Sequence, residues 1–171
     1  MTERCGYFTM GKFDQFNRDV PYSALTQAFN KVCRYMLMED SETLAERKTG
    51  ILEAVGDDGQ IIIDVIPDLE LIIGPQKGVI EVGSIEAQNR FNQTFHKFIK
   101  VLCGKDHPFV LFIDDLQWVD SASLNLLKGL LLDDVEYLMV IGAYRDNEVD
   151  SSHPLLLALE EIKKSGLPSV I

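Results

Sequence analysis

The stretch Phe109-Val-Leu-Phe-Ile-Asp-Asp-Leu-Gln-Trp118 decides the fold class. Its first five residues are all apolar, and two acids follow at once. An apolar run of this length, without alternation, predicts a strand that is buried on both faces, as in a parallel sheet. A second such run lies at residues 137–144 and ends in Arg145-Asp146, with a helix expected between the two runs at 121–132. Buried strands that alternate with helices indicate an α/β fold, in which helices flank a parallel sheet.

The segments before this stretch supply further helices and one more strand. Apolar residues recur at spacings of three and four over 22–37 and over 85–103, which predicts two amphipathic helices. A helix is also expected over 41–55, with Ser41 as its cap, and another over 154–164. Aromatic and β-branched residues between glycines at 6–13 predict a strand.

Two segments leave alternatives open. Within 60–74, Ile61-Ile62-Ile63 is typical of a strand, whereas the residues after Pro67 are compatible with a short helix. Val170-Ile171 is compatible with the start of a further strand.

Composition and charge narrow the classes of function. The chain has 171 residues, which predicts one domain, and its 16 Lys+Arg against 27 Asp+Glu give a net charge of −11. This balance argues against broad binding to a nucleic-acid backbone or to an anionic membrane surface. The longest apolar runs fall short of the roughly 18 to 20 residues that a membrane span needs. Cys5, Cys33 and Cys103 are odd in number and widely spaced, so we expect a reducing, cytoplasmic location.

Charged residues follow both apolar runs at the point where each strand should end. Ligands bind at the carboxyl ends of the strands in open α/β sheets, so these residues mark the candidate site. An apolar strand followed by two acids is the Walker B pattern of P-loop ATPases. On this interpretation Asp114 binds Mg²⁺, Asp115 orients or deprotonates the attacking water, and Arg145 reaches the γ-phosphate. The alternative is that the two acids merely end a strand.

A Walker A loop should precede these acids, and the one match to its pattern is unconvincing. Residues 6–12 spell GxxxxGK, but Phe13 stands where a Ser or Thr must bind Mg²⁺. The loop positions include Tyr7 and Phe8, and such bulky side chains hinder a backbone that must wrap a phosphate. We therefore interpret this match as a decoy.

Five blocks of sequence, in order along the chain, together resemble one family. They are GYFTMGKFDQ at 6–15, VPYSAL at 20–25, EAQNRF at 86–91, VLFIDDLQW at 110–118 with DSASL at 120–124, and IGAYRDNEV at 141–149. The family is the AAA-type, Orc1-like, STAND-class P-loop ATPase domain of multi-sensor signalling proteins. In such proteins the domain lies between a serine/threonine-kinase-like domain and GAF and histidine-kinase modules.

The resemblance implies roles for the site residues and also a departure from the family. Asp114 matches the metal-binding residue of Walker B, Asp115 matches the catalytic acid, and Arg145 falls in the sensor region; the implied cofactors are ATP and Mg²⁺ in the intact parent protein. Gly11 and Lys12 match a second-strand segment. The strand, Walker A loop and helix that should come first are missing from the match, so residues 1–171 are expected to form a partial domain that is inactive alone.

Two functions from different classes remain open. The first is an ATP-binding and hydrolysing segment of a regulatory switch, whose partners are kinase-like and sensor domains of the same polypeptide. The second is a non-catalytic interaction or scaffold module that kept the ATPase fold. Because a parallel sheet without its first strand exposes unpaired edges and apolar faces, we also expect instability, self-association or aggregation.

Overall fold

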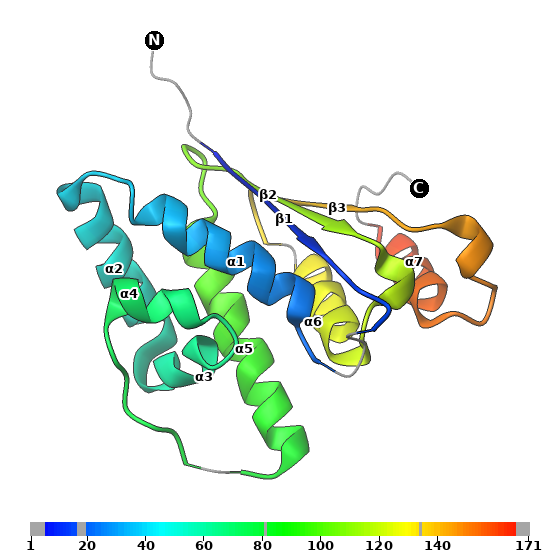
Figure 1. Cartoon of the computed structure of the whole chain (residues 1–171), viewed down its shortest axis with the longest axis horizontal. Helices are drawn as coiled ribbons and strands as arrows, with labels where there is room; N and C mark the ends of the chain where they lie inside the picture. Colours follow the sequence, from blue (N-terminus) through cyan, green and yellow to red (C-terminus); the bar gives the residue numbers. More distant parts are fainter. Residues whose placement is uncertain (1–5, 17–19, 81, 134, 167–171) are drawn as a thin grey trace.

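Three parallel strands form the sheet that the apolar runs predict. The computed structural model describes residues 6–16, 20–80, 82–133 and 135–166. Strand β1 spans Tyr7–Lys12, β2 spans Phe109–Asp114 and β3 spans Leu138–Gly142, and they pair in the order β1-β2-β3 (Figure 1). Both pairings are parallel, with Lys12 opposite Asp114 and Ile113 opposite Gly142. The predicted α/β class is confirmed, and the architecture is compatible with a P-loop NTPase-like fold.

The helices follow the predicted pattern, with one correction at a cap. They are α1 (Ser23–Met36), α2 (Ser41–Val55), α3 (Gly59–Ile63), α4 (Glu70–Ile73), α5 (Ser84–Leu102), α6 (Ser121–Leu132) and α7 (Pro154–Lys164). Four single turns of 3₁₀ helix complete the elements: η1 (Gly56–Asp58), η2 (Pro67–Leu69), η3 (Leu116–Trp118) and η4 (Asp146–Glu148). Ser41 is the first residue of α2 and not its cap. Asp40 caps the helix instead, because its carboxylate accepts hydrogen bonds from the backbone N–H groups of Glu42 and Thr43.

The ambiguous segment 60–74 is helical, so the strand alternative for the three isoleucines is wrong. Ile62 and Ile63 are both buried, and α3 packs against α5. Adjacent residues of a strand point to opposite faces, whereas a short helix can turn two neighbours toward the same core. The final prediction, a strand at Val170-Ile171, falls on residues outside those that the structure describes.

The core lies on one side of the sheet, where α1 packs against β1 and its Phe29 stacks on Phe109 of β2. Phe29 of α1 is its centre, with ring centroids 5.2 Å from Phe95, 6.0 Å from Phe98 and 5.7 Å from Phe109. Helix α1 lies so close to β1 that a Cβ added at Gly11 would stand 2.0 Å from the carbonyl oxygen of Ala24. The glycine is therefore required by the packing of α1 on β1.

The other side of the sheet displays apolar side chains, so the prediction that the apolar strand at 109–113 is buried on both faces is wrong: only alternate residues of β2 are buried. The apolar side chains alternate with the buried residues along β1 and β2, and across the sheet they lie in register: Phe8 and Met10 of β1, Val110 and Phe112 of β2, and Met139 and Ile141 of β3. Phe8 and Met139 are each 57% exposed and Met10 is 40% exposed. We call these six residues the open sheet face. Patches of contiguous exposed apolar side chains are typical of interaction surfaces.

Within the described ranges, no helix has the length and apolar character that crossing a membrane requires.

Candidate functional site

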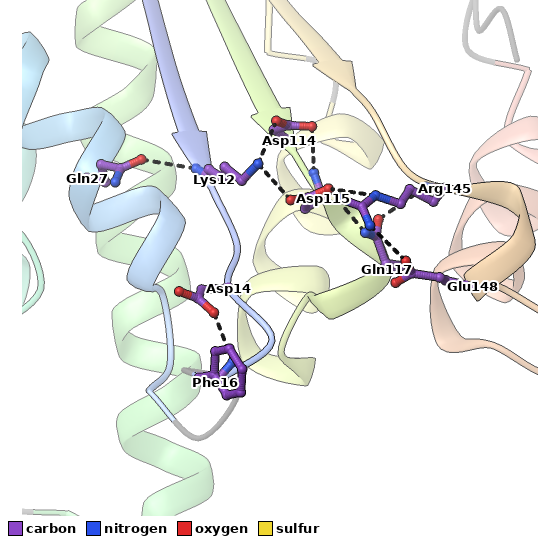
Figure 2. Close-up of polar contacts among 9 residues, drawn as sticks. All are labelled: Lys12, Asp14, Phe16, Gln27, Asp114, Asp115, Gln117, Arg145 and Glu148. Atoms are coloured by element: carbon purple, nitrogen blue, oxygen red, sulfur yellow. Dashed lines mark hydrogen bonds and ion pairs between the residues drawn. The ribbon is translucent and has the colours of Figure 1, made fainter.

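The charged residues of all three strand ends meet at the carboxyl edge of the sheet (Figure 2). The Lys12 ammonium at the end of β1 lies 2.8 Å from Asp115 Oδ2 and 3.4 Å from Asp114 Oδ2. The guanidinium Nε of Arg145, which follows β3, lies 3.7 Å from Asp115 Oδ1. The structure thus brings together Asp114, Asp115 and Arg145, the three residues that the sequence singles out.

A left-handed turn at Asp115 allows both acids to face one point. Successive side chains of a strand point to opposite faces, so two consecutive acids of β2 would diverge if the strand continued. Asp115 instead adopts φ 53° and ψ 45°, which aspartate tolerates better than most residues. The Asp115 N–H donates to Asp114 Oδ1 at 2.9 Å, which closes the turn. Both carboxylates therefore reach the single ammonium of Lys12.

Asp115 is a buried carboxylate that stays ionised. Its side chain is 7% exposed, whereas the side chain of Lys12 is 53% exposed. The adjacent Lys12 ammonium, followed by the amide of Gln117 and the charge of Arg145, holds the pKa of Asp115 below its usual range against the opposing effect of burial. Asp115 in turn raises the pKa of Lys12. Both groups therefore carry full charge at neutral pH.

Gln117 organises the acid and the arginine, and the sequence did not predict this role. Its side chain is buried, its Nε2 donates to Asp115 Oδ1 at 3.1 Å, and its Oε1 accepts from the Arg145 N–H at 3.2 Å. Its backbone carbonyl lies 3.2 Å from Nε2 of His153, the residue that caps α7. The indication that the sequence offered is position: Gln117 lies two residues after Asp115, within the block 110–118 that resembles the family.

Arg145 is held by two further neighbours. Its Nη1 pairs with Glu148 at 3.0 Å, and its guanidinium lies 5.4 Å from the centre of the Trp118 ring, within the range of a cation–π contact. Trp118 is half-buried and packs against the core, and it also orients this arginine.

A hollow of about 570 Å³ opens beside these residues. Its lining includes Lys12, Asp115 and Arg145, and also the aromatic residues Phe13, Phe16 and Trp118. The lining also carries two acids, Asp14 and Asp115, which balance the charges of its two cations.

The two acids suit a metal ion that brings other ligands with it. In the described part of the chain, no group of three or more His, Cys, Asp or Glu side chains could hold a metal. Asp115 Oδ2 is nevertheless a buried oxygen that accepts no hydrogen bond from the described residues. Mg²⁺ is commonly bound by one or two carboxylates, with water and substrate phosphates as its remaining ligands. Asp114 and Asp115 fit that requirement.

The segment 6–12 is not a phosphate loop. Residues Tyr7–Lys12 form strand β1, as the rejection of the GxxxxGK match required. Lys12 contacts both acids all the same, because parallel pairing places it opposite Asp114. The sequence places Lys12 in a strand but does not predict this contact.

The three converging strand ends belong to an α/β domain that is compatible with a P-loop NTPase-like fold, and comparison with known proteins identifies its family. The chain belongs to the AAA ATPase domain family, whose model matches residues 1–141. It is 39% identical over 124 residues to the hybrid signal transduction histidine kinase G of Dictyostelium discoideum. The alignment covers 72% of this chain and 4% of the amoebal protein. No solved structure matches the chain significantly. The resemblance to ATPase domains of signalling proteins is thus confirmed.

Proposed function

We propose that this chain is the part of an ATP-dependent regulatory switch that carries the Walker B acids and the sensor arginine. The observation that carries the proposal is the convergence of Asp114, Asp115 and Arg145 at the carboxyl edge of a parallel sheet. Family membership and the similarity to a signal transduction kinase support it.

The chemistry assigned to each residue follows from its charge and burial. Asp114 would hold Mg²⁺, which neutralises charge on the β- and γ-phosphates when bound. Asp115 is ionised and buried, and its Oδ2, which lies 2.8 Å from the Lys12 ammonium, can orient a water molecule and accept its proton. Arg145 is preorganised by Trp118 and Glu148, so it can stabilise negative charge on a γ-phosphate with little further ordering.

The open sheet face supports the proposal that residues 1–171 form part of a larger domain. The outer edge of β1 is protected by α1: the Lys12 N–H donates to Gln27 Oε1 at 3.1 Å, and Lys31 Nζ donates to the Met10 carbonyl at 3.1 Å. The exposed side chains of the open sheet face have no comparable cover. We propose that another segment of the same polypeptide supplies a strand, a phosphate loop and a helix that packs on this face.

The proposed setting is a cytoplasmic signalling polypeptide that also contains kinase-like and sensor domains. The name of the amoebal relative and its much greater length favour this setting. ATP binding would stabilise one arrangement of the domains, and hydrolysis would return the protein to the other.

The decisive experiment measures ATP hydrolysis by the polypeptide that joins this chain to a GxxxxGK[ST] loop. Asp115→Asn keeps the shape of the side chain and removes its base, so hydrolysis should fall by about 10²- to 10⁴-fold while ATP still binds. Asp57→Asn is a matched control, since Asp57 is exposed and lies in η1. Unchanged hydrolysis by Asp115→Asn would refute the assigned role.

A second candidate function is a non-catalytic interaction module, and the open sheet face is the observation that favours it. Six apolar side chains in register offer a docking surface that needs no nucleotide. This second function is the correct one if two results are found together. The chain binds the other domains of the polypeptide equally well with and without Asp115→Asn, and the intact polypeptide hydrolyses no ATP.

A further inference from the structure

We propose that Lys12 is a built-in counter-ion that occupies the cation site between Asp114 and Asp115 and competes with a divalent metal ion for it. The inference rests on the proposed function, because it concerns the metal site assigned there to Asp114. It adds a residue that the Walker B pattern does not contain.

The geometry places the Lys12 ammonium between one oxygen of each acid. Both of its contacts are to Oδ2 atoms, at 3.4 Å for Asp114 and 2.8 Å for Asp115. The remaining oxygens have other partners: Asp114 Oδ1 accepts from the Asp115 N–H, and Asp115 Oδ1 accepts from Gln117. The two Oδ2 atoms are thus the ones left for a cation, and Lys12 supplies it.

Burial makes a positive charge at this point necessary. The Asp115 side chain is only 7% exposed. Its Oδ2 is a buried oxygen, and the contact that it makes within the described residues is the one with the Lys12 ammonium. An ionised oxygen in that position is costly unless a cation lies beside it. Arg145 does not fill the role, because it approaches Oδ1 and is held on that side by Glu148 and Trp118.

Lys12 is fixed at its backbone, whereas its side chain is half-exposed. Pairing with β2 and the hydrogen bond from its N–H to Gln27 fix the main chain. The side chain is 53% exposed and lines the hollow of about 570 Å³. The ammonium can therefore leave the acids without any change in the strand.

Two cations cannot occupy one position between the same oxygens. A divalent ion that binds there must displace the ammonium toward the hollow, where Lys12 would face the phosphates of a nucleotide. The ion pair therefore keeps the acids neutralised before a ligand binds, and it lowers the affinity of the site for metal alone. Lys12 is on this account a positioning residue for the two acids.

The test measures Mn²⁺ binding by the 171-residue chain in the absence of nucleotide. Electron paramagnetic resonance and calorimetry report the binding. Lys12→Met should bind Mn²⁺ about tenfold more tightly than the parent chain, because a unit charge a few Å from the metal is removed. Lys12→Arg should restore the parent affinity. Lys48→Met is the matched control, since Lys48 is exposed on α2 and its loss changes net charge equally.

A further variant separates failure of this inference from failure of the proposed function. Asp114→Asn should abolish the Mn²⁺ binding of both the parent chain and Lys12→Met. Binding that is lost in Asp114→Asn but equal in Lys12→Met and the parent would overturn the role of Lys12 alone. Binding that persists in Asp114→Asn, or that is absent from the parent and from Lys12→Met, would overturn the metal site and the inference together.

Discussion

Replacement of Gln117 by methionine tests whether the buried network at the strand ends contributes to stability. Methionine keeps the length of the side chain and its apolar stem, and it removes both polar groups. The variant loses the hydrogen bond from Nε2 to the Asp115 carboxylate and the hydrogen bond from the Arg145 N–H to Oε1. Gln117 is 3% exposed, so water cannot readily replace either bond.

The expected loss follows from the two bonds. A hydrogen bond to a charged group contributes about 1.5–3 kcal/mol and a neutral one about 1 kcal/mol to the free energy of unfolding. The apolar end of the buried methionine recovers about 1 kcal/mol of transfer free energy. Gln117→Met should therefore lower the free energy of unfolding by about 1.5–3 kcal/mol.

The assay is urea unfolding followed by the fluorescence of Trp118, which is the one tryptophan of the sequence, with circular dichroism as a second probe. With a slope of about 2 kcal/mol per molar urea, the midpoint should fall by about 1 M or slightly more. Gln60→Met is the matched control, because Gln60 Nε2 donates to Asp64 Oδ1 at 2.8 Å on an exposed helix surface. That bond is worth only about 0.2–0.5 kcal/mol. Equal midpoint shifts for the two variants would refute the reasoning.

Three further predictions concern the core, the thiols and the open sheet face. Phe29→Ala should lower the free energy of unfolding by about 3–5 kcal/mol, whereas Phe16→Ala should change it by less than about 0.5 kcal/mol, since Phe16 is 84% exposed; urea unfolding of both variants measures this. Burial raises the pKa of Cys33 and of Cys103 to about 12. In a Cys5→Ser chain, iodoacetamide at pH 8 should therefore label both thiols slowly until urea unfolds the protein. Fast labelling of the native chain would count against this prediction. Phe8→Lys combined with Met139→Lys should reduce both the binding of a hydrophobic dye and self-association. Leu157 on α7 is 51% exposed and lies outside the open sheet face, so Leu157→Lys should change neither if that face is responsible.

The sequence predicts the sheet well because its strands are apolar on both faces. The runs that contain β2 and β3 have no helical periodicity, which indicates strands. Charged residues follow each run, and they indicate where each strand ends. The carboxyl edge of a parallel sheet then brings the terminal residues together without any knowledge of side-chain contacts. This is why Asp114, Asp115 and Arg145 could be grouped from the sequence.

The features that the sequence did not predict depend on tertiary contacts. Ile61-Ile62-Ile63 has the composition of a strand, and only packing against α5 decides for a helix. Lys12 is correctly placed in a strand, but its contact with the acids depends on the register of β1 against β2, which the sequence does not specify. Gln117 is one polar residue in a short turn, and nothing local indicates that both ends of its amide are used.

The backbone at Asp115 indicates that the site is formed in advance of any ligand. A non-glycine residue in the left-handed region commonly costs about 1–3 kcal/mol and persists where its surroundings fix it. Here the turn is fixed on both sides: the Trp118 N–H donates to the Asp115 carbonyl at 3.0 Å, and the Leu116 N–H donates to the Ala143 carbonyl at 2.9 Å. The second bond ties the residue after the acid to the end of β3, beside Arg145. Because these bonds join the chain's own groups, the acids and the arginine keep their relative positions without metal or nucleotide. The exposed side chain of Lys12 can then move in response to a ligand while the backbone of the site stays fixed.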